Sequence, residues 1–167
     1  MTATRGHLIS VTINGRPTEF SVAPNLSLLE LLRTDGGSPE VKLGCGEGVC
    51  GTCTVLLDGE PVNACLVWAV QADGCEITTV RGLAAEGELH DLQNAFLDHA
   101  GSQCGFCTPG MLLTVKWYLD RHPAADREEL RHAIAGNLCR CTGYTKILDA
   151  IEAYRDLRLK DADGDGD

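Results

Sequence analysis

Cysteine is the residue type with the clearest chemical meaning in this chain, because it occurs nine times in 167 residues. Cys45, Cys50 and Cys53 have the spacing C-x4-C-x2-C, and Cys65 follows after eleven intervening residues. This spacing is typical of a 2Fe–2S cluster, in which three thiolates come from one loop and the fourth from a separate segment. A structural zinc site is the alternative, but it usually combines two closely spaced pairs. We therefore predict a 2Fe–2S cluster on these four cysteines.

Glycines at positions 44, 46, 48 and 51 interrupt the loop that carries the first three cysteines. Glycine adopts positive φ angles without steric cost, so this loop can wrap closely around a bound group. Its backbone N–H groups can then point at the sulfur atoms and stabilise their negative charge. The glycines favour a cluster over zinc or a disulfide here.

A second cysteine set combines C-x2-C, at Cys104 and Cys107, with C-x-C, at Cys139 and Cys141. Each pair precedes a predicted helix, whose N-terminal partial positive charge favours thiolates. A zinc site made of two cysteine pairs also fits this spacing. The C-x-C pair favours a second cluster, because two thiolates so close in sequence can bind one iron.

Cys75 is left over from both sets and lies next to a predicted strand, where cysteine more often packs as a small apolar side chain than binds a metal. The odd number of cysteines argues against a fully paired disulfide framework. Clustered cysteines in a reducing compartment instead indicate metal or redox chemistry.

Two different patterns of elements must position these cysteines. Up to about residue 80, alternating apolar residues predict a small mixed sheet, with a capping box at Ser27 and Glu30 opening one short helix. Turns are predicted at Asn14-Gly15 and Asp58-Gly59. Beyond residue 88, apolar residues at helical spacing predict four short helices, the third opened by a capping box at Asp126 and Glu129. The acidic tail at 161–167 is expected to be disordered.

Composition limits the partners of this chain. Its formal net charge is −10, and an acidic surface repels nucleic acid and anionic membranes. No apolar run approaches the roughly 18–20 residues that span a bilayer, and the N-terminus lacks the pattern of an export signal. We therefore expect a cytoplasmic protein that binds neither nucleic acid nor membrane.

Three cysteine motifs together resemble one known family, the molybdenum hydroxylases that include xanthine dehydrogenase, aldehyde oxidoreductase and carbon monoxide dehydrogenase. The resemblance covers about residues 7–157. The three motifs are GCGEGVCGTCTV at 44–55, QCGFCTPGM at 103–111 and GNLCRCTGY at 136–144.

The resemblance implies an α+β fold with two cluster domains. Residues 1–82 would form a β-grasp, 2Fe–2S ferredoxin-like domain, and residues 83–160 a four-helix bundle that binds the second 2Fe–2S cluster. By the same resemblance, Gln103 and Cys141 contact a molybdopterin cofactor that a partner subunit carries.

The family function implied is electron transfer. A large subunit would carry molybdopterin as its cytosine dinucleotide, and a medium subunit would carry FAD. Electrons would pass one at a time from the molybdopterin centre through both clusters to the FAD. The complex would be a heterotrimer or its dimer, hydroxylating an aldehyde or N-heterocyclic aromatic carbon with oxygen from water. This chain would supply no catalytic residue. The alternatives are a free two-cluster ferredoxin-type carrier and a zinc-binding interaction module.

Overall fold

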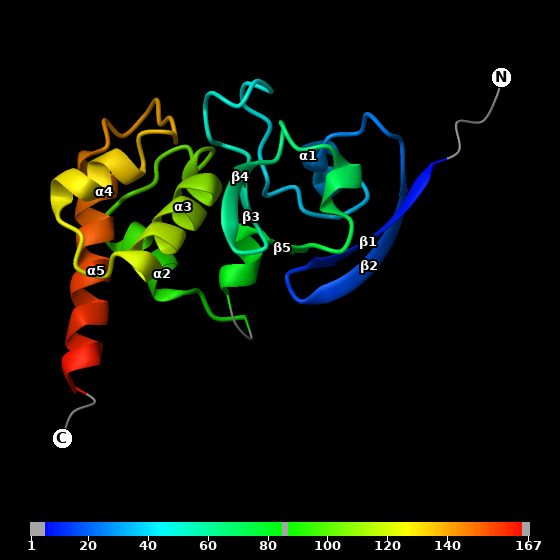
Figure 1. The fold of residues 1–167 in the computed structure, drawn as a ribbon. Helices are drawn as coiled ribbons and strands as arrows, with labels where there is room; N and C mark the ends of the chain where they lie inside the picture. The colour runs from blue at the N-terminus through cyan, green and yellow to red at the C-terminus, as the bar shows by residue number, and fades with distance from the viewer. Residues whose placement is uncertain (1–5, 85–86, 165–167) are drawn as a thin grey trace.

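The computed structural model describes residues 6–84 and 87–164 of the chain. The buried apolar side chains form two separate hydrophobic cores. The first consists of residues between Ile9 and Ile77, and the second of residues between Val80 and Tyr154. We call the residues up to 79 the sheet half and those from 80 onward the helical half. Figure 1 shows the two halves side by side.

The sheet half opens with an antiparallel hairpin of β1 (His7–Ile13) and β2 (Arg16–Val22). Its two-residue turn has φ angles of 49° at Asn14 and 76° at Gly15. Positive φ at both positions is what a type I′ turn requires, and Asn-Gly is its preferred pair. The predicted hairpin is confirmed.

Three shorter strands complete a five-stranded mixed sheet within the described residues, in the order β2-β1-β5-β3-β4. β5 pairs parallel with β1 and antiparallel with β3. The predicted turn at Asp58-Gly59 joins β3 to β4. The bounds are β3 (Thr54–Leu57), β4 (Glu60–Asn63) and β5 (Glu76–Thr78), with 3₁₀ turns η1 (Ala69–Ala72) and η2 (Val80–Leu83).

One helix, α1 (Leu28–Arg33), contributes to the core of the sheet half. The predicted capping box is present: the Ser27 hydroxyl accepts from the Glu30 backbone N–H, and the Glu30 carboxylate accepts from the Ser27 N–H. Leu28, Leu31 and Leu32 are fully buried. The cap and the apolar face together explain why so short a segment is helical.

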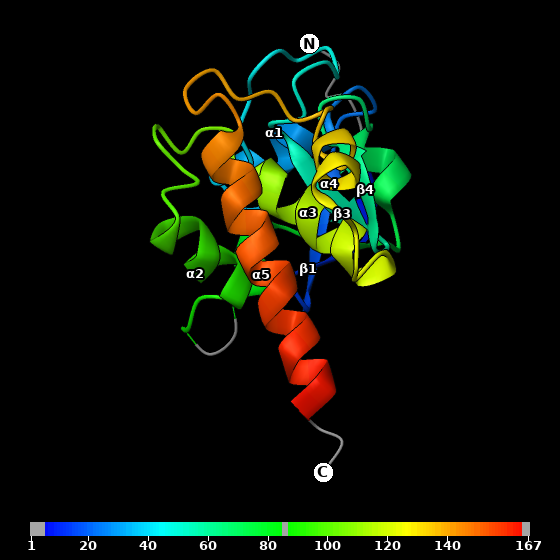
Figure 2. The same cartoon turned by 90° about the vertical axis from the view of Figure 1, so that its left-hand side faces the viewer.

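Four α-helices make up most of the described helical half, as predicted, and the fold is α+β. The longest helix, α5, runs down one side of this half (Figure 2). The helices are α2 (Asp91–Asp98), α3 (Thr108–Arg121), α4 (Arg127–Ala133) and α5 (Thr145–Gly164). Among the described residues, none of the helices combines the length and the apolar character needed to cross a membrane.

The end of α5 corrects one expectation. Residues 161–164 continue this helix instead of belonging to a disordered tail, and residues 165–167 lie outside the described part of the chain. A helix that is already formed extends at low cost, because each added residue contributes one hydrogen bond without a new nucleation step. No proline interrupts the segment before Gly164.

The two halves meet where α3 packs against β3 and β4. Trp117 Nε1 donates to the Glu60 carboxylate at 3.0 Å, and the Arg121 guanidinium pairs with the same carboxylate at 2.5 Å. Arg121 also stacks on the Trp117 ring, 4.7 Å from its centroid. These three residues, Glu60, Trp117 and Arg121, form a polar clamp that links the start of β4 to the C-terminal part of α3.

Candidate metal centres

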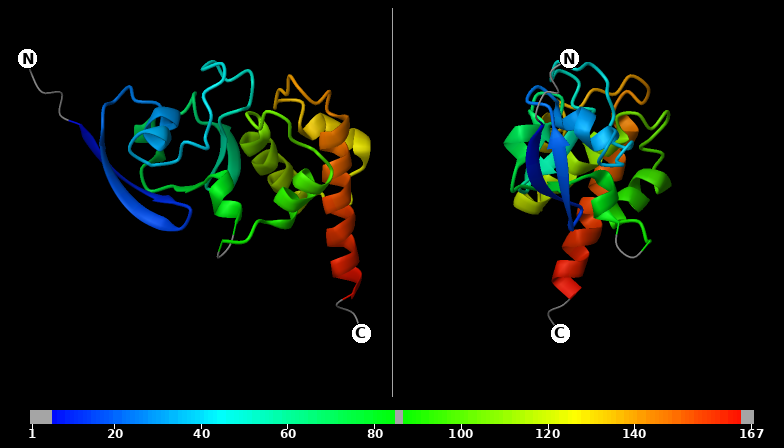
Figure 3. Two further views of the ribbon diagram at one scale, coloured as in Figure 1. Left: turned by 180° about the vertical axis from the view of Figure 1, so that it is seen from behind. Right: turned by 90° about the vertical axis from the view of Figure 1, so that its right-hand side faces the viewer.

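The three loops that carry most of the cysteines lie along one edge of the molecule. Figures 1 and 3 place the loop before β3, the loop before α3 and the loop before α5 at this edge, although they are far apart in sequence. The sheet and the bundle therefore present both cysteine sets on the same side.

In the first set, Cys53 immediately precedes β3 and Cys65 lies just after β4, so the antiparallel pair brings them together. The thiol of Cys45 interacts with that of Cys50, and the thiol of Cys53 with that of Cys65. Cys53 is 3% exposed, whereas Cys45 is at the surface. The structure thus brings these four cysteines together.

Backbone N–H groups surround the outermost sulfur of this group. The Glu47 N–H donates to Cys45 Sγ at 3.3 Å. This bond, followed by that from the Cys50 N–H, lowers the pKa of Cys45 to about 6. Burial has the opposite effect deeper in the site and raises the pKa of Cys53 to about 12. Coordination to a metal cation deprotonates such a thiol.

The loop also winds tightly around its sulfur atoms. Gly46 and Gly48 have φ angles of 73° and 75°, a region that disfavours other residues. A Cβ at Gly44 would lie 2.8 Å from Cys50 Sγ, so a side chain there would displace a sulfur. Together with the N–H groups aimed at sulfur, this tight glycine-rich loop fits a 2Fe–2S cluster.

In the second set, Cys104 Sγ and Cys141 Sγ lie 3.5 Å apart, and the thiols of Cys107 and Cys139 also interact. Cys107 is the N-cap residue of α3, so the C-x2-C pair precedes a helix, as predicted. Cys141 instead lies in the loop, four positions before Thr145 begins α5. These four cysteines also form one group.

The pairing in this group corrects one prediction. The C-x-C motif suggested that Cys139 and Cys141 bind one iron, but each lies against a different cysteine of the C-x2-C motif. The reason is that the loop before α3 and the loop before α5 face each other at this point. Two sulfur pairs per group suit a dinuclear cluster, with one pair for each iron.

Polar groups also surround the second set. The N–H of Phe106, and then the Cys141 thiol, lower the pKa of Cys104. Burial raises the pKa of Cys107 to about 12. Burial acts against ionisation at Cys139 too, but the Thr142 hydroxyl, 3.1 Å from its sulfur, helps to lower that pKa overall. Thr142 is not among the residues that the cysteine spacing predicts for this site.

Zinc would need all four sulfurs around a single point, at about 2.3 Å from the ion. Within the described ranges, no three Cys, His, Asp or Glu side chains converge in that way. The sulfurs lie in facing pairs instead, and such pairs suit the two irons of a dinuclear cluster.

The remaining cysteine and the predicted pterin contact lie in different surroundings. Cys75 is half-buried beside Asp58, and burial followed by that carboxylate raises its pKa. Gln103 is exposed next to Cys104 and Cys141, which are exposed as well.

Exposed apolar side chains lie next to cysteines of both groups in the chain. Those near the first group include Val49, 64% exposed, and Leu66, 60% exposed. Phe106 and Leu138 flank the second group and are 46% and 49% exposed.

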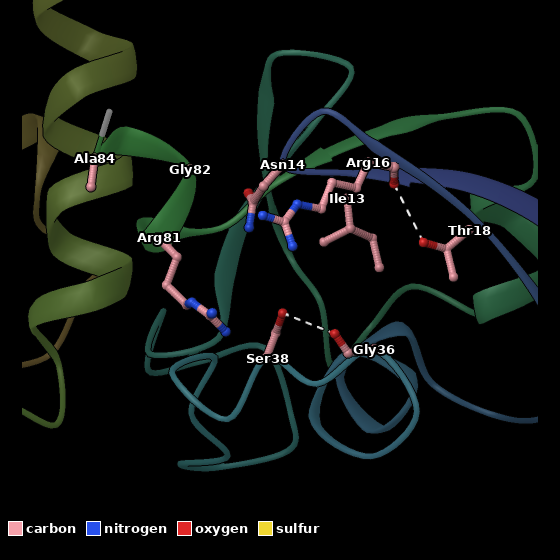
Figure 4. Close-up of a pocket in the computed structure, with 9 residues that line it drawn as sticks. All are labelled: Ile13, Asn14, Arg16, Thr18, Gly36, Ser38, Arg81, Gly82 and Ala84. Carbon is pink, nitrogen blue, oxygen red and sulfur yellow. Dashed lines mark hydrogen bonds between the residues drawn. The ribbon is translucent and has the colours of Figure 1, made fainter. Parts of the chain in front are cut away.

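A separate polar cavity of about 340 Å³ lies between the β1–β2 turn and the segment after α1. Figure 4 shows Arg16 and Arg81 directed toward it, with Ser38 on the opposite wall. Arg81 also donates to the Gly37 carbonyl. No cysteine lines this cavity, so it is distinct from both candidate metal centres.

Comparison with known proteins agrees with this geometry. Residues 11–79 match the family described as "2Fe-2S iron-sulfur cluster binding domain", and residues 79–152 match the "[2Fe-2S] binding domain". The nicotinate dehydrogenase small FeS subunit of Eubacterium barkeri is 48% identical over 143 residues, which are 86% of this chain and 91% of that protein. The xanthine dehydrogenase iron-sulfur-binding subunit of Escherichia coli O157:H7 is 43% identical, over 86% of this chain and 91% of that one.

Solved structures give the same result. A chain of quinoline 2-oxidoreductase from Pseudomonas putida 86 superposes with a TM-score of 0.89 at 47% identity, covering 93% of this chain and 98% of that one. The aldehyde oxidoreductase of Desulfovibrio desulfuricans ATCC 27774 gives a TM-score of 0.88 at 38% identity, over 92% of this chain but 17% of that longer one. With two iron–sulfur domains in one chain and relatives of this length, the protein belongs to the small iron–sulfur subunits of the xanthine dehydrogenase family of molybdenum hydroxylases.

Proposed function

We propose that eight of the nine cysteines bind two 2Fe–2S clusters. Cys45 with Cys50, and Cys53 with Cys65, would each hold one iron of the first cluster. The observation that carries this proposal is the grouping of the sulfurs into pairs that face each other. In the second cluster, the iron-binding pairs would be Cys104 with Cys141 and Cys107 with Cys139.

A 2Fe–2S cluster, when bound, takes up and releases one electron at a time. The residues of this chain hold it, shield it and adjust its charge. The Glu47 and Phe106 N–H groups stabilise negative charge on sulfur, and buried Cys53 and half-buried Cys107 shield one side of each site from water.

We infer that electrons pass singly from a molybdopterin centre, through the cluster of the helical half and then that of the sheet half, to a flavin. Molybdopterin, as its cytosine dinucleotide, would belong to a large subunit and FAD to a medium subunit, in a cytoplasmic heterotrimer or its dimer. Exposed Gln103, Cys104 and Cys141 support a pterin contact at the helical half. The subunit designations of relatives such as "Caffeine dehydrogenase subunit gamma" support a multi-subunit assembly.

The substrate class is inferred from the relatives. The names of several of them contain nicotinate, caffeine or nicotine, which are N-heterocyclic compounds. Another is an aldehyde oxidoreductase. We therefore propose that the complete enzyme hydroxylates an N-heterocyclic aromatic carbon or an aldehyde, and that its substrate binds outside this chain.

Anaerobic purification of this chain together with the protein chains that bind it tests the proposal. We expect a brown protein with about four iron atoms per copy of this chain, because each cluster contains two. Reduction with dithionite should give two distinct paramagnetic signals, and flavin and molybdopterin chains should co-purify in equal amounts. A colourless protein that contains zinc would contradict the cluster assignment. A brown chain that purifies alone would instead indicate a free carrier.

A further inference from the structure

The loops of the two proposed clusters contact each other directly. The Leu138 N–H donates to the Cys50 carbonyl oxygen at 2.9 Å. Leu138 immediately precedes Cys139, so a single hydrogen bond joins the backbone of a cysteine in the first group to the residue next to a cysteine in the second. This bond crosses the boundary between the sheet half and the helical half.

A buried asparagine holds the two loops in this position. Asn137 is 4% exposed, and its Nδ2 donates to the Gly51 carbonyl at 2.9 Å, with Thr54 Oγ1 at 3.4 Å. The Tyr144 hydroxyl donates to the Asn137 carbonyl and accepts from the Cys139 N–H. A polar side chain is buried at low cost only when it is hydrogen-bonded, so these partners define the position of Asn137.

Two glycines allow the loops to approach this closely. A Cβ at Gly51 would lie 2.3 Å from the Gly136 carbonyl oxygen, and one at Gly110 would lie 2.4 Å from the Gly51 carbonyl oxygen. Both distances are far shorter than an ordinary van der Waals contact. The halves therefore touch backbone to backbone at this point because neither position carries a side chain.

We propose that Asn137, Gly51 and Gly110 are positioning residues that fix the separation of the two clusters, and that the Leu138–Cys50 hydrogen bond completes the shortest bonded route between them. This inference rests on the proposed function. In the step concerned, one electron leaves the cluster of the helical half and is gained by the cluster of the sheet half. No bond is made or broken, and no proton moves.

Ordinary packing between two domains is the competing explanation. The clamp of Glu60 with Trp117 and Arg121 provides the comparison, because it joins the same two halves away from the cysteines. If packing alone mattered, loosening the clamp would alter the magnetic and electron-transfer coupling between the two clusters as much as loosening the Asn137 contact would. If the proposal holds, only changes at Asn137, Gly51 or Gly110 alter the coupling.

Gly110→Ala is the sharpest test. Gly110 lies in the first turn of α3, where alanine is the better helix former, so the helix itself is not weakened. The added methyl group must push away the Gly51 carbonyl. Asn137→Ala removes the hydrogen bond instead. Gly136→Ala is the matched control, because no described atom outside Gly136 and its two chain neighbours lies within 4 Å of its added Cβ. Glu60→Ala loosens the clamp.

Three measurements on the loaded protein separate the outcomes. Iron content and the two paramagnetic signals test the proposed function alone. The spin–spin splitting between the two clusters in the fully reduced protein reports their separation, because magnetic dipolar coupling falls with the cube of distance. Freeze-quench after substoichiometric dithionite reports how fast the electron equilibrates between them.

We expect Gly110→Ala and Asn137→Ala to retain both signals, to lose the splitting and to slow equilibration, whereas Gly136→Ala and Glu60→Ala behave as wild type. Wild-type splitting and equilibration in Gly110→Ala would overturn the proposal. So would loss of iron from both Gly110→Ala and Asn137→Ala, since these residues would then serve loop folding. Absence of both signals from the wild type would instead overturn the proposed function.

Discussion

Cys104 and Cys141 lie 3.5 Å apart, sulfur to sulfur, although 37 positions separate them in the sequence. The loop before α3 supplies one thiol and the loop before α5 supplies the other. This contact exists only when the helices of the bundle are assembled, so the proposed second cluster both depends on the helical half and links its loops.

Cys104→Ser should therefore remove the cluster of the helical half and leave that of the sheet half. Serine oxygen is a poor substitute for thiolate in an iron–sulfur cluster. We expect the iron content to fall by half and one of the two paramagnetic signals to disappear. Turnover with external electron acceptors should stop, and turnover that survives without the cluster would contradict the serial electron path.

Cys75→Ala is the matched control for that experiment, since Cys75 is the cysteine that belongs to neither group. It lies beside Asp58 and Asp73 on the sheet half. We expect iron content and both signals to stay at the wild-type level. Loss of iron from this variant would show that the ligand assignment is wrong.

Glu60→Ala should lower stability modestly without changing either cluster. The carboxylate accepts from Trp117 and Arg121, but this ion pair is largely exposed. Exposed pairs contribute about 0.2–1 kcal/mol, and salt screens them. Thermal unfolding at low and high salt is the measurement, and the difference from wild type should shrink at high salt. A loss that does not change with salt would mean that packing of Trp117, and not charge, holds the clamp.

Ser27→Ala should destabilise the sheet half through α1. The Ser27 hydroxyl accepts from the Glu30 N–H at 3.1 Å. Loss of such a cap costs about 1 kcal/mol. Ser27→Asp keeps an acceptor at the same place and should retain most of the stability. Denaturant unfolding of both variants is the measurement, and equal destabilisation by the two would exclude a capping role.

His90 should make stability depend on pH. Its Nδ1 accepts from the Leu92 N–H at 3.1 Å, which caps α2. Burial lowers the pKa of His90 below its usual 6.5, the nearby Lys116 lowers it further, and the carboxylates of Asp91 and Asp120 oppose the shift. The unfolded chain therefore binds the proton at higher pH than the folded one, so the free energy of unfolding decreases as pH falls below about 6.5.

The variant His90→Asn tests this prediction, because asparagine also caps a helix but does not titrate. Thermal unfolding at several pH values between about 5 and 7 is the measurement. We expect the variant to lose less stability than wild type on acidification. Parallel curves for the two proteins would mean that another group causes the pH dependence.

Local features of this fold were predictable because short stretches of chain decide them. The Asn14-Gly15 turn needs only two residues that accept positive φ, and the α1 cap needs only Ser27 and Glu30. The parallel pairing of β5 with β1 was not predictable in the same way. It joins residues more than sixty positions apart and depends on how the whole sheet assembles.

The sequence by itself predicted which cysteines belong together, since short fixed spacings, in a glycine-rich loop or ahead of a helix, are typical of thiolates that bind one cluster. Only the tertiary structure decided that Cys139 faces Cys107 instead of pairing with Cys141, and that Asn137 bonds to Gly51, 86 positions away. Spacing along a chain restricts contacts over a few residues, whereas contacts between loops depend on the packing of the helices and strands that carry them.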